Sequence, residues 1–147
     1  MSQGNMTFTE NFLFYGSVPA LTDDGSVATA WIPAGNLINA VGYVMVGATD
    51  ITVDAKWQSA TDASGTGAAD VTGAAITQLT ALAGDDKQAA IELEIGKLAT
   101  TRTHVQFSAT AGNGSLGASL AVMAIGNPRR KPPTQPATLV EVVKVKG

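Results

Sequence analysis

The stretch ITVDAKWQ, residues 51–58, alternates apolar and polar side chains without a break. A period of two residues is typical of a β-strand with one buried and one solvated face. We therefore expect a strand here, with Trp57 in the core. The apolar positions of this strand are Ile51, Val53, Ala55 and Trp57.

The same alternation recurs at residues 89–95 and 103–109, whereas residues 37–46 and 119–125 are apolar at almost every position. A strand that is apolar on both faces lies at the centre of a sheet or under a neighbouring subunit. Short helices are the alternative for these two segments, although their glycines and β-branched residues argue against it. Clusters of Gly, Asp, Asn and Ser separate the strands, so the sequence predicts an all-β fold, a single jelly-roll-like β-sandwich. Further strand candidates are residues 12–15, 27–32, 74–79 and 139–145.

Composition favours a single domain whose burial of apolar surface is completed by partner subunits. The chain has 147 residues and no cysteine, and only 5% of its residues are aromatic. A chain of this length forms one domain by default. Much of the 45% hydrophobic fraction is alanine, which buries little area. We therefore expect a homo-oligomer.

The charge divides the chain into a body and an arm. Residues 1–127 hold four basic and eleven acidic residues, a net charge of −7, whereas residues 128–147 hold five basic and one acidic residue, a net charge of +4. The prolines of NPRRKPPTQP favour an extended path, so we expect an arm over residues 128–147 whose terminal strand pairs with its own sheet or with another subunit. The interface residues predicted on this arm are Arg129, Arg130, Lys131, Leu139, Val140, Val142, Val143 and Val145.

The three consecutive basic residues of the arm have two open interpretations. They dock on an acidic protein surface, or they are simply solvated. Three bases without interleaved aromatics make a poor nucleic-acid footprint, so we expect no nucleic-acid partner.

One motif points to a nucleotide site. AGNGSLG, residues 111–117, has the G-x-G-x-x-G spacing that can cradle a pyrophosphate. A dinucleotide-binding fold needs a helix that begins at the third glycine, followed by a strand that returns to the same parallel sheet. Only nine residues separate Gly117 from Asn127, which is too few for this unit. We therefore expect a glycine-rich hairpin loop between the strands at 103–110 and 119–125.

Other residues that can carry chemistry favour surface roles. His104, the only histidine, falls on the polar face of its strand, and the acidic pairs at 23–24 and 85–86 lack calcium-loop spacing. Glu92 and Glu94 lie on the same face of their strand, an arrangement that is common on exposed strands. No nucleophile elbow, P-loop or Ser/His/Asp signature is present, so we expect no enzyme, no cofactor and no metal site.

Two longer stretches are read as connections. Residues 59–70 consist of small and polar residues and predict an exposed loop. Residues 81–90 predict one helical turn or a tight turn. The longest apolar run, LGASLAVMAIG, is shorter than the roughly 18 residues of a membrane span, and the first residues lack a signal-peptide pattern, so we expect no membrane partner.

The succession VGATDITVDAKWQSATDASGTGAADVTGAAITQLTA, DDKQAAIELEIGKL, THVQFSATAGNG and AVMAIGNPRR resembles a group of small virion-associated proteins of tailed bacteriophages, often encoded beside the major capsid protein. The resemblance covers about residues 37–130 and lies in the texture and order of the strands. It implies a capsid decoration or cement protein, often a trimer, that binds the major capsid protein. The group has no catalytic signature, and similar proteins end shortly after the equivalent of NPRR, whereas this chain continues with KPPTQPATLVEVVKVKG.

The resemblance and the composition together predict a structural protein of the virion. We expect it on the outer capsid surface, after synthesis in the host cytoplasm. A neck, tail or fibre component would have the same composition. A carbohydrate-binding β-sandwich module is the alternative from another class, and the scarcity of Trp and Tyr argues against it.

Overall fold

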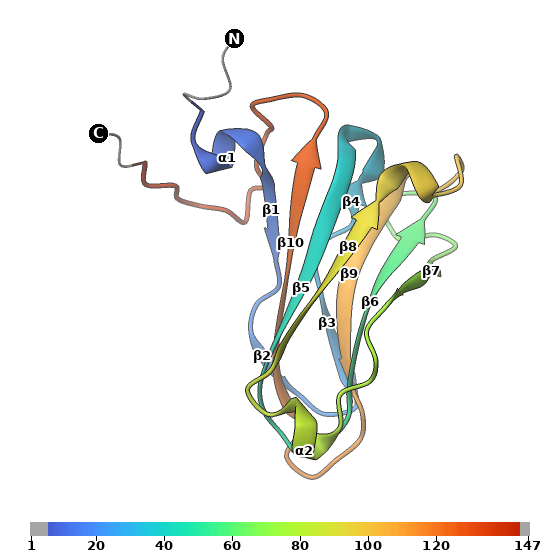
Figure 1. Ribbon diagram of the computed structural model, residues 1–147, viewed down its shortest axis with the longest axis vertical. Coiled ribbons are helices and arrows are strands. Elements are labelled where there is room, and N and C mark those ends of the chain that lie inside the picture. Colours follow the sequence, from blue (N-terminus) through green and yellow to red (C-terminus); the bar gives the residue numbers. More distant parts are fainter. Residues whose placement is uncertain (1–5, 145–147) are drawn as a thin grey trace.

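The computed structural model describes residues 6–144, without the side chains of residues 82 and 83, and is built almost entirely from β-strands (Figure 1). One sheet, sheet A, contains β1 (Leu13–Gly16), β2 (Ala20–Thr22), β5 (Leu37–Thr49), β8 (Gln88–Glu94) and β10 (Ala118–Pro128). The other, sheet B, contains β3 (Gly25–Ala28), β4 (Ile32–Pro33), β6 (Val53–Ala60), β7 (Ala69–Ala75) and β9 (His104–Ala111). The helical pieces are α1 (Phe8–Asn11), α2 (Ala81–Gly84) and two 3₁₀ turns, η2 (Ala34–Asn36) and η3 (Ile95–Lys97).

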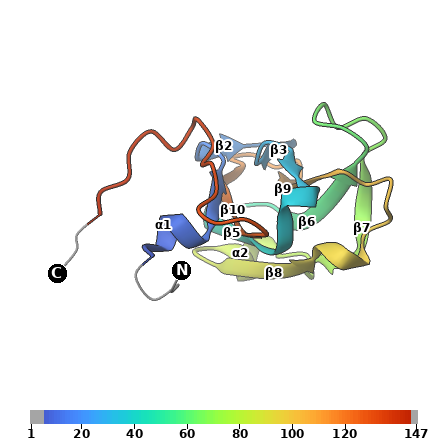
Figure 2. The same ribbon diagram turned by 90° about the horizontal axis from the view of Figure 1, so that it is seen from above.

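The strand pairing is nested. β10 pairs with β1 and β2, β9 with β3 and β4, β8 with β5, and β7 with β6, all antiparallel. β5 also pairs with β10, and β6 with β9. These pairings complete the two sheets, which pack as two layers (Figure 2). This is jelly-roll topology, and the predicted fold class is confirmed.

The core lies between the two sheets and is centred on two aromatic rings. Trp57 on β6 and Phe107 on β9 are fully buried and pack with their centroids 5.2 Å apart. The Trp57 Nε1–H donates a hydrogen bond to the Ile91 carbonyl at 3.0 Å, which ties sheet B to sheet A. Gly42 of β5 lies against Phe107 so closely that a Cβ there would overlap the ring. The prediction that Trp57 lies in the core is confirmed.

Most predicted strands are present, with shifted ends. The two segments that are apolar on both faces became β5 and β10, the central pair of sheet A. The predicted strand at 74–79 is displaced, because β7 spans Ala69–Ala75 and only Leu79 of the following stretch makes an isolated bridge, to Val53. The predicted loop at 59–70 is correspondingly shorter, since β6 extends to Ala60. A helical turn forms at α2, which is one of the two alternatives predicted for residues 81–90.

The predicted hairpin between β9 and β10 is wrong. β9 lies in sheet B and β10 in sheet A, so residues 112–117 cross from one layer to the other. The crossing ends at Gly117, whose φ of +82° and closeness to the Thr22 carbonyl leave no room for a side chain. Period-two patterning marks both strands but carries no information on which sheet each joins.

Candidate interaction surfaces

The outer face of sheet A carries an apolar surface that no other layer of the described chain covers as a whole. Cross-strand register places Phe14, Ile125 and Val41 in one row across β1, β10 and β5. The next rows add these outward side chains: Met123, Tyr43, Ala90, Ala121 and Met45. We call these eight residues the apolar face; all are partly or fully exposed.

The outer face of sheet B is different because its polar side chains pair with one another. Lys56 and Gln58 both contact the Asp70 carboxylate, at 2.8 and 3.0 Å, and the Ser26 and Thr110 hydroxyls lie 2.8 Å apart. Apolar residues alternate with polar ones on this sheet, as expected for one face against the core and one in water. The contrast singles out the apolar face as the surface of the sandwich suited to a partner.

Acidic residues border the apolar face along β8. Glu92 is the cross-strand neighbour of Val41, and Glu94 that of Asn39. The Glu94 carboxylate contacts the Lys97 ammonium at 3.3 Å, whereas Glu92 has no ion pair among the described residues. A groove of about 520 Å³ is lined by this border, Val41, Ile125 and Phe12, and it continues around the β8 edge to residues 71–74 of β7. The arrangement suits an apolar ligand that carries positive charge.

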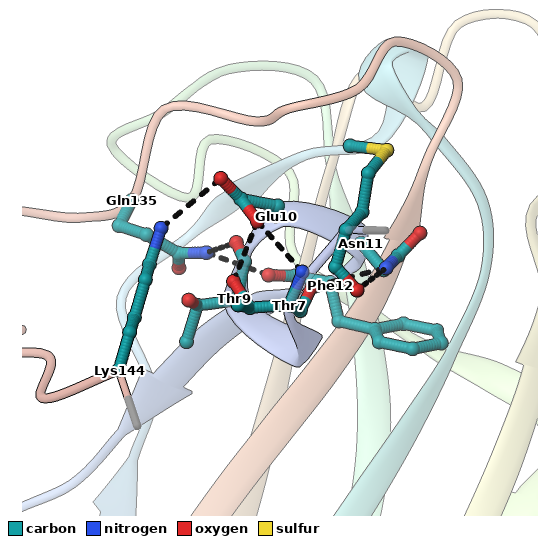
Figure 3. Close-up of polar contacts among 8 residues, drawn as sticks. Thr7, Thr9, Glu10, Asn11, Phe12, Gln135 and Lys144 are labelled. Atoms are coloured by element: carbon teal, nitrogen blue, oxygen red, sulfur yellow. Dashed lines mark hydrogen bonds and ion pairs between the residues drawn. The ribbon is translucent and has the colours of Figure 1, made fainter. Parts of the chain in front are cut away.

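At one end of the apolar face, α1 and the C-terminal arm meet (Figure 3). The Phe8 ring of α1 packs on Phe12 and Phe14, with centroid separations of 4.6 and 5.6 Å. The Gln135 amide of the arm donates to the carbonyls of Thr9 at 2.8 Å and Phe12 at 2.6 Å, and its oxygen accepts from the Phe14 amide at 3.1 Å. One arm side chain therefore fixes the entry to β1.

A second contact holds the far part of the arm. The Glu10 carboxylate accepts hydrogen bonds from the Thr7 hydroxyl and amide, at 2.7 and 2.6 Å, and pairs with the Lys144 ammonium at 3.2 Å. These bonds, the Thr7 ones first, lower the Glu10 pKa to about 2. Glu10 is thus an anionic anchor for the arm, and sequence reasoning missed both this junction and Gln135.

The predicted arm residues divide into two groups. Arg129 and Arg130 border a second cavity, of about 700 Å³, and the Arg129 amide donates to the Asn36 carbonyl at 2.7 Å. The Lys131 ammonium lies 5.4 Å from the centre of the Phe12 ring. Leu139 is partly exposed, and three valines are exposed: Val140, Val142 and Val143.

The predicted terminal strand is wrong for residues 139–144, which form no strand; Val145 lies outside the described residues. The segment is rich in β-branched residues, yet a strand also needs an edge to pair with. In both ribbon views the arm extends to one side of the sandwich (Figures 1 and 2). The described arm therefore has strand-forming residues without a strand partner.

The glycine-rich crossing at 112–117 is filled by the chain's own carboxylates. Asp50 accepts hydrogen bonds from the amides of Ser115, Leu116 and Gly117, at 3.1, 2.9 and 3.0 Å, and Asp23 accepts one from the Gly114 amide at 2.7 Å. The amide bonds to Asp50, that of Leu116 first, lower its carboxyl pKa. The donors that a pyrophosphate would use are occupied, and β10 follows in place of a helix, so the motif is a structural crossing.

The remaining sequence candidates are turn and surface residues. The Asp85 carboxylate accepts from the Thr49 amide at 2.7 Å, and the next residue, Asp86, has a φ of +52°, as a tight turn requires. His104 is partly exposed, with Nδ1 2.8 Å from the Thr103 hydroxyl. Residues 6–144 hold no group of three or more potential metal ligands. In the same range, no helix combines the length and apolar character of a membrane span.

Comparison with solved structures finds similar folds in proteins of very different sequence. The PBSX exported protein XepA matches with a TM-score of 0.54 and 8% identity, over 99% of this chain and 47% of XepA, so this chain spans about half the length of that protein. The N-terminal cellulose-binding domain of Cellulomonas fimi β-1,4-glucanase C has a TM-score of 0.41 and 13% identity, over 82% of this chain and 91% of the domain. A protein of the Bacillus endospore appendages, described as disulfide-linked pili, has a TM-score of 0.40 and 14% identity, over 86% of this chain and 98% of that one.

No family model matches the chain, and no curated protein matches it. At 8% identity, the likeness to XepA concerns the fold. The comparison with XepA therefore supports the β-sandwich fold, and a shared fold does not by itself indicate function.

Proposed function

We propose that the chain is a structural protein of a tailed-phage virion that binds the outer capsid surface as a homo-oligomer and stabilises the shell. The apolar face is the observation that carries this proposal. It gives each sandwich a broad surface for contact with another subunit of the homo-oligomer, and the described part of the chain covers only its α1 end. The proposal assigns the protein no catalysis and no cofactor.

Two further features support a structural role. Jelly-roll sandwiches are common in viral capsid proteins, although the fold alone does not fix function. The arm gives each subunit a second contact point, so weak contacts can multiply across a symmetric lattice. Both features are consistent with the sequence resemblance to virion-associated phage proteins.

The test is binding to capsids that lack the protein. Purified protein is added to shells assembled from the major capsid protein of the same phage, and the bound fraction is measured by co-sedimentation and cryo-electron microscopy. Regular density on the outer shell, and a higher temperature of shell disruption, are the expected results. Density at the neck or tail of whole particles, with a bare shell, would overturn the capsid assignment in favour of the other virion roles.

A carbohydrate-binding role finds little support in the side chains. Such modules line a groove with exposed aromatic rings. Here Trp57 and Phe107 are buried in the core, and the exposed Phe8 ring packs on Phe12 and Phe14 and, in the described chain, lines no groove with them. Retention on insoluble polysaccharide that soluble oligosaccharide reverses would reinstate this alternative.

A further inference from the structure

The arm presents apolar side chains that its own body does not bury. Val140 and Val143 are 91% and 75% exposed. Both ends of the segment that contains them are held at α1, by Gln135 and by Lys144. The valines between these anchors are therefore displayed away from the sandwich of the same chain.

The apolar face is a surface on which the exposed valines of an arm can pack. Its rows are apolar across three strands, and the acidic side chain nearest to them, Glu92, has no ion pair in the described chain. The body carries a net charge of −7, and the arm carries +4. The opposite charges of arm and body favour contact between them over contact between two bodies. Segment 137–144 itself, with Glu141 and Lys144, has no net charge, so it matches the face through its apolar side chains.

The sheet edges narrow the ways in which the arm can bind. On the β1 edge, the Phe14 amide is already bonded to Gln135; on the β8 edge, the Ile91 carbonyl is bonded to Trp57. β7 contains Gly73 at a φ of +77° beside a register shift, a feature that protects an edge against pairing. The fourth edge, formed by β3 and β4, is interrupted between Ala28 and Ile32. Each edge is thus blocked or irregular, whereas the apolar face is open.

From these observations we propose that the apolar face of sheet A receives the arm segment 137–144 of a second copy of this chain. The proposal deepens the homo-oligomeric part of the proposed function and rests on it. In this arrangement the valines of the segment lie on the apolar rows, while Lys144 stays paired with Glu10 of its own chain. Because arm and face are different surfaces, the contact is heterologous, and it forms a closed ring when the rotation between subunits closes.

The absence of cysteine makes thiol cross-linking a clean test. Single-cysteine full-length chains carry Val143→Cys on the arm, Ala90→Cys on the apolar face, or Thr110→Cys on the outer face of sheet B as the matched control. The arm variant is ¹⁵N-labelled and mixed with either partner under mild oxidation, and mass spectrometry counts the mixed dimers. We expect roughly tenfold more mixed dimer with Ala90→Cys than with Thr110→Cys, because a bound arm raises the local thiol concentration.

Three results would overturn the inference. They are equal cross-linking to both partners, no mixed dimer with either, and a monomer-mass cross-link within a Val143→Cys, Ala90→Cys double variant, which would place the arm on its own face. Capsid binding measured in parallel separates the two proposals. If wild-type protein binds shells but the cross-link fails, the proposed capsid binding stands and this inference is wrong. If the cross-link forms but the protein does not bind shells, the inference stands and the proposed capsid binding is wrong.

Discussion

Gly42 is the residue with the least room for change in the core. A Cβ at this position would overlap the Phe107 ring, so the constraint is space, and the backbone conformation is ordinary. We expect Gly42→Ala to lower the free energy of unfolding by about 1–3 kcal/mol, the usual cost of overpacking. Gly35→Ala is the control, because a Cβ there meets nothing within 4 Å, and a change within about 0.5 kcal/mol is expected. Urea denaturation measures both; equal losses would contradict the packing argument.

Trp57 combines burial with a hydrogen bond between the sheets. Replacing it with alanine leaves a cavity beside Phe107 and an unpaired Ile91 carbonyl. We expect Trp57→Ala to cost about 3–5 kcal/mol of unfolding free energy, measured by chemical denaturation. Trp57→Phe keeps part of the ring volume and loses the bond, so it should fall between wild type and the alanine variant. A loss below about 1 kcal/mol for alanine would mean that the ring does not fill the core.

Asp50 links stability to pH through the glycine-rich crossing. Its three amide hydrogen bonds hold the folded-state pKa below the value of the unfolded chain. Such a group contributes stability that is complete above the unfolded pKa of about 4 and is lost as pH falls through the folded one. We expect Asp50→Asn to be less stable than wild type at pH 7, with the difference narrowing below about pH 4. Unfolding free energies at both pH values test this, and a difference independent of pH would contradict it.

At the scale of elements, the junction of α1 with the arm depends more on Gln135 than on Lys144. The Gln135 amide makes three hydrogen bonds to backbone groups around β1, whereas the Lys144 to Glu10 ion pair is partly exposed. Exposed ion pairs contribute little. We expect Gln135→Ala to speed hydrogen exchange at the Phe14 amide roughly tenfold, the equivalent of about one lost hydrogen bond, and Lys144→Ala to leave it almost unchanged. An equal increase in exchange rate in both variants would mean that the Lys144 to Glu10 ion pair contributes as much to the junction as Gln135 does.

The sequence predicts the strands better than their partners. Alternation identified β6, β8 and β9, and the two doubly apolar segments proved to be β5 and β10 at the centre of sheet A. Those segments also carried the signal for the apolar face, since one side of each lies in the core and the other faces outward. The crossing at 112–117 was mistaken for a hairpin because the bonds that shape it come from distant Asp23 and Asp50. Local patterns do not contain such contacts, and the same holds for Gln135 reaching back to α1.

For the whole molecule, the division of charge and the division of apolar surface coincide. The acidic sandwich presents the apolar face, and the basic arm presents the exposed valines. Since each chain carries both halves of the proposed contact, every subunit in a ring would give one arm and receive one. The sandwich completes its own core, so assembly adds to a fold that is already closed.

This arrangement predicts that ending the chain after Gln135 separates folding from association. The shortened chain keeps the Gln135 bonds to Thr9, Phe12 and Phe14, and it loses only segments without strand structure in the described range. We expect an unfolding midpoint close to that of the full chain, and a solution mass by light scattering that falls to that of the monomer. Paired point variants provide the control: Val143→Asp should weaken association, whereas Val18→Asp, at a valine 82% exposed between β1 and β2, should not. An unchanged mass after truncation would remove residues 136–147 from the interface.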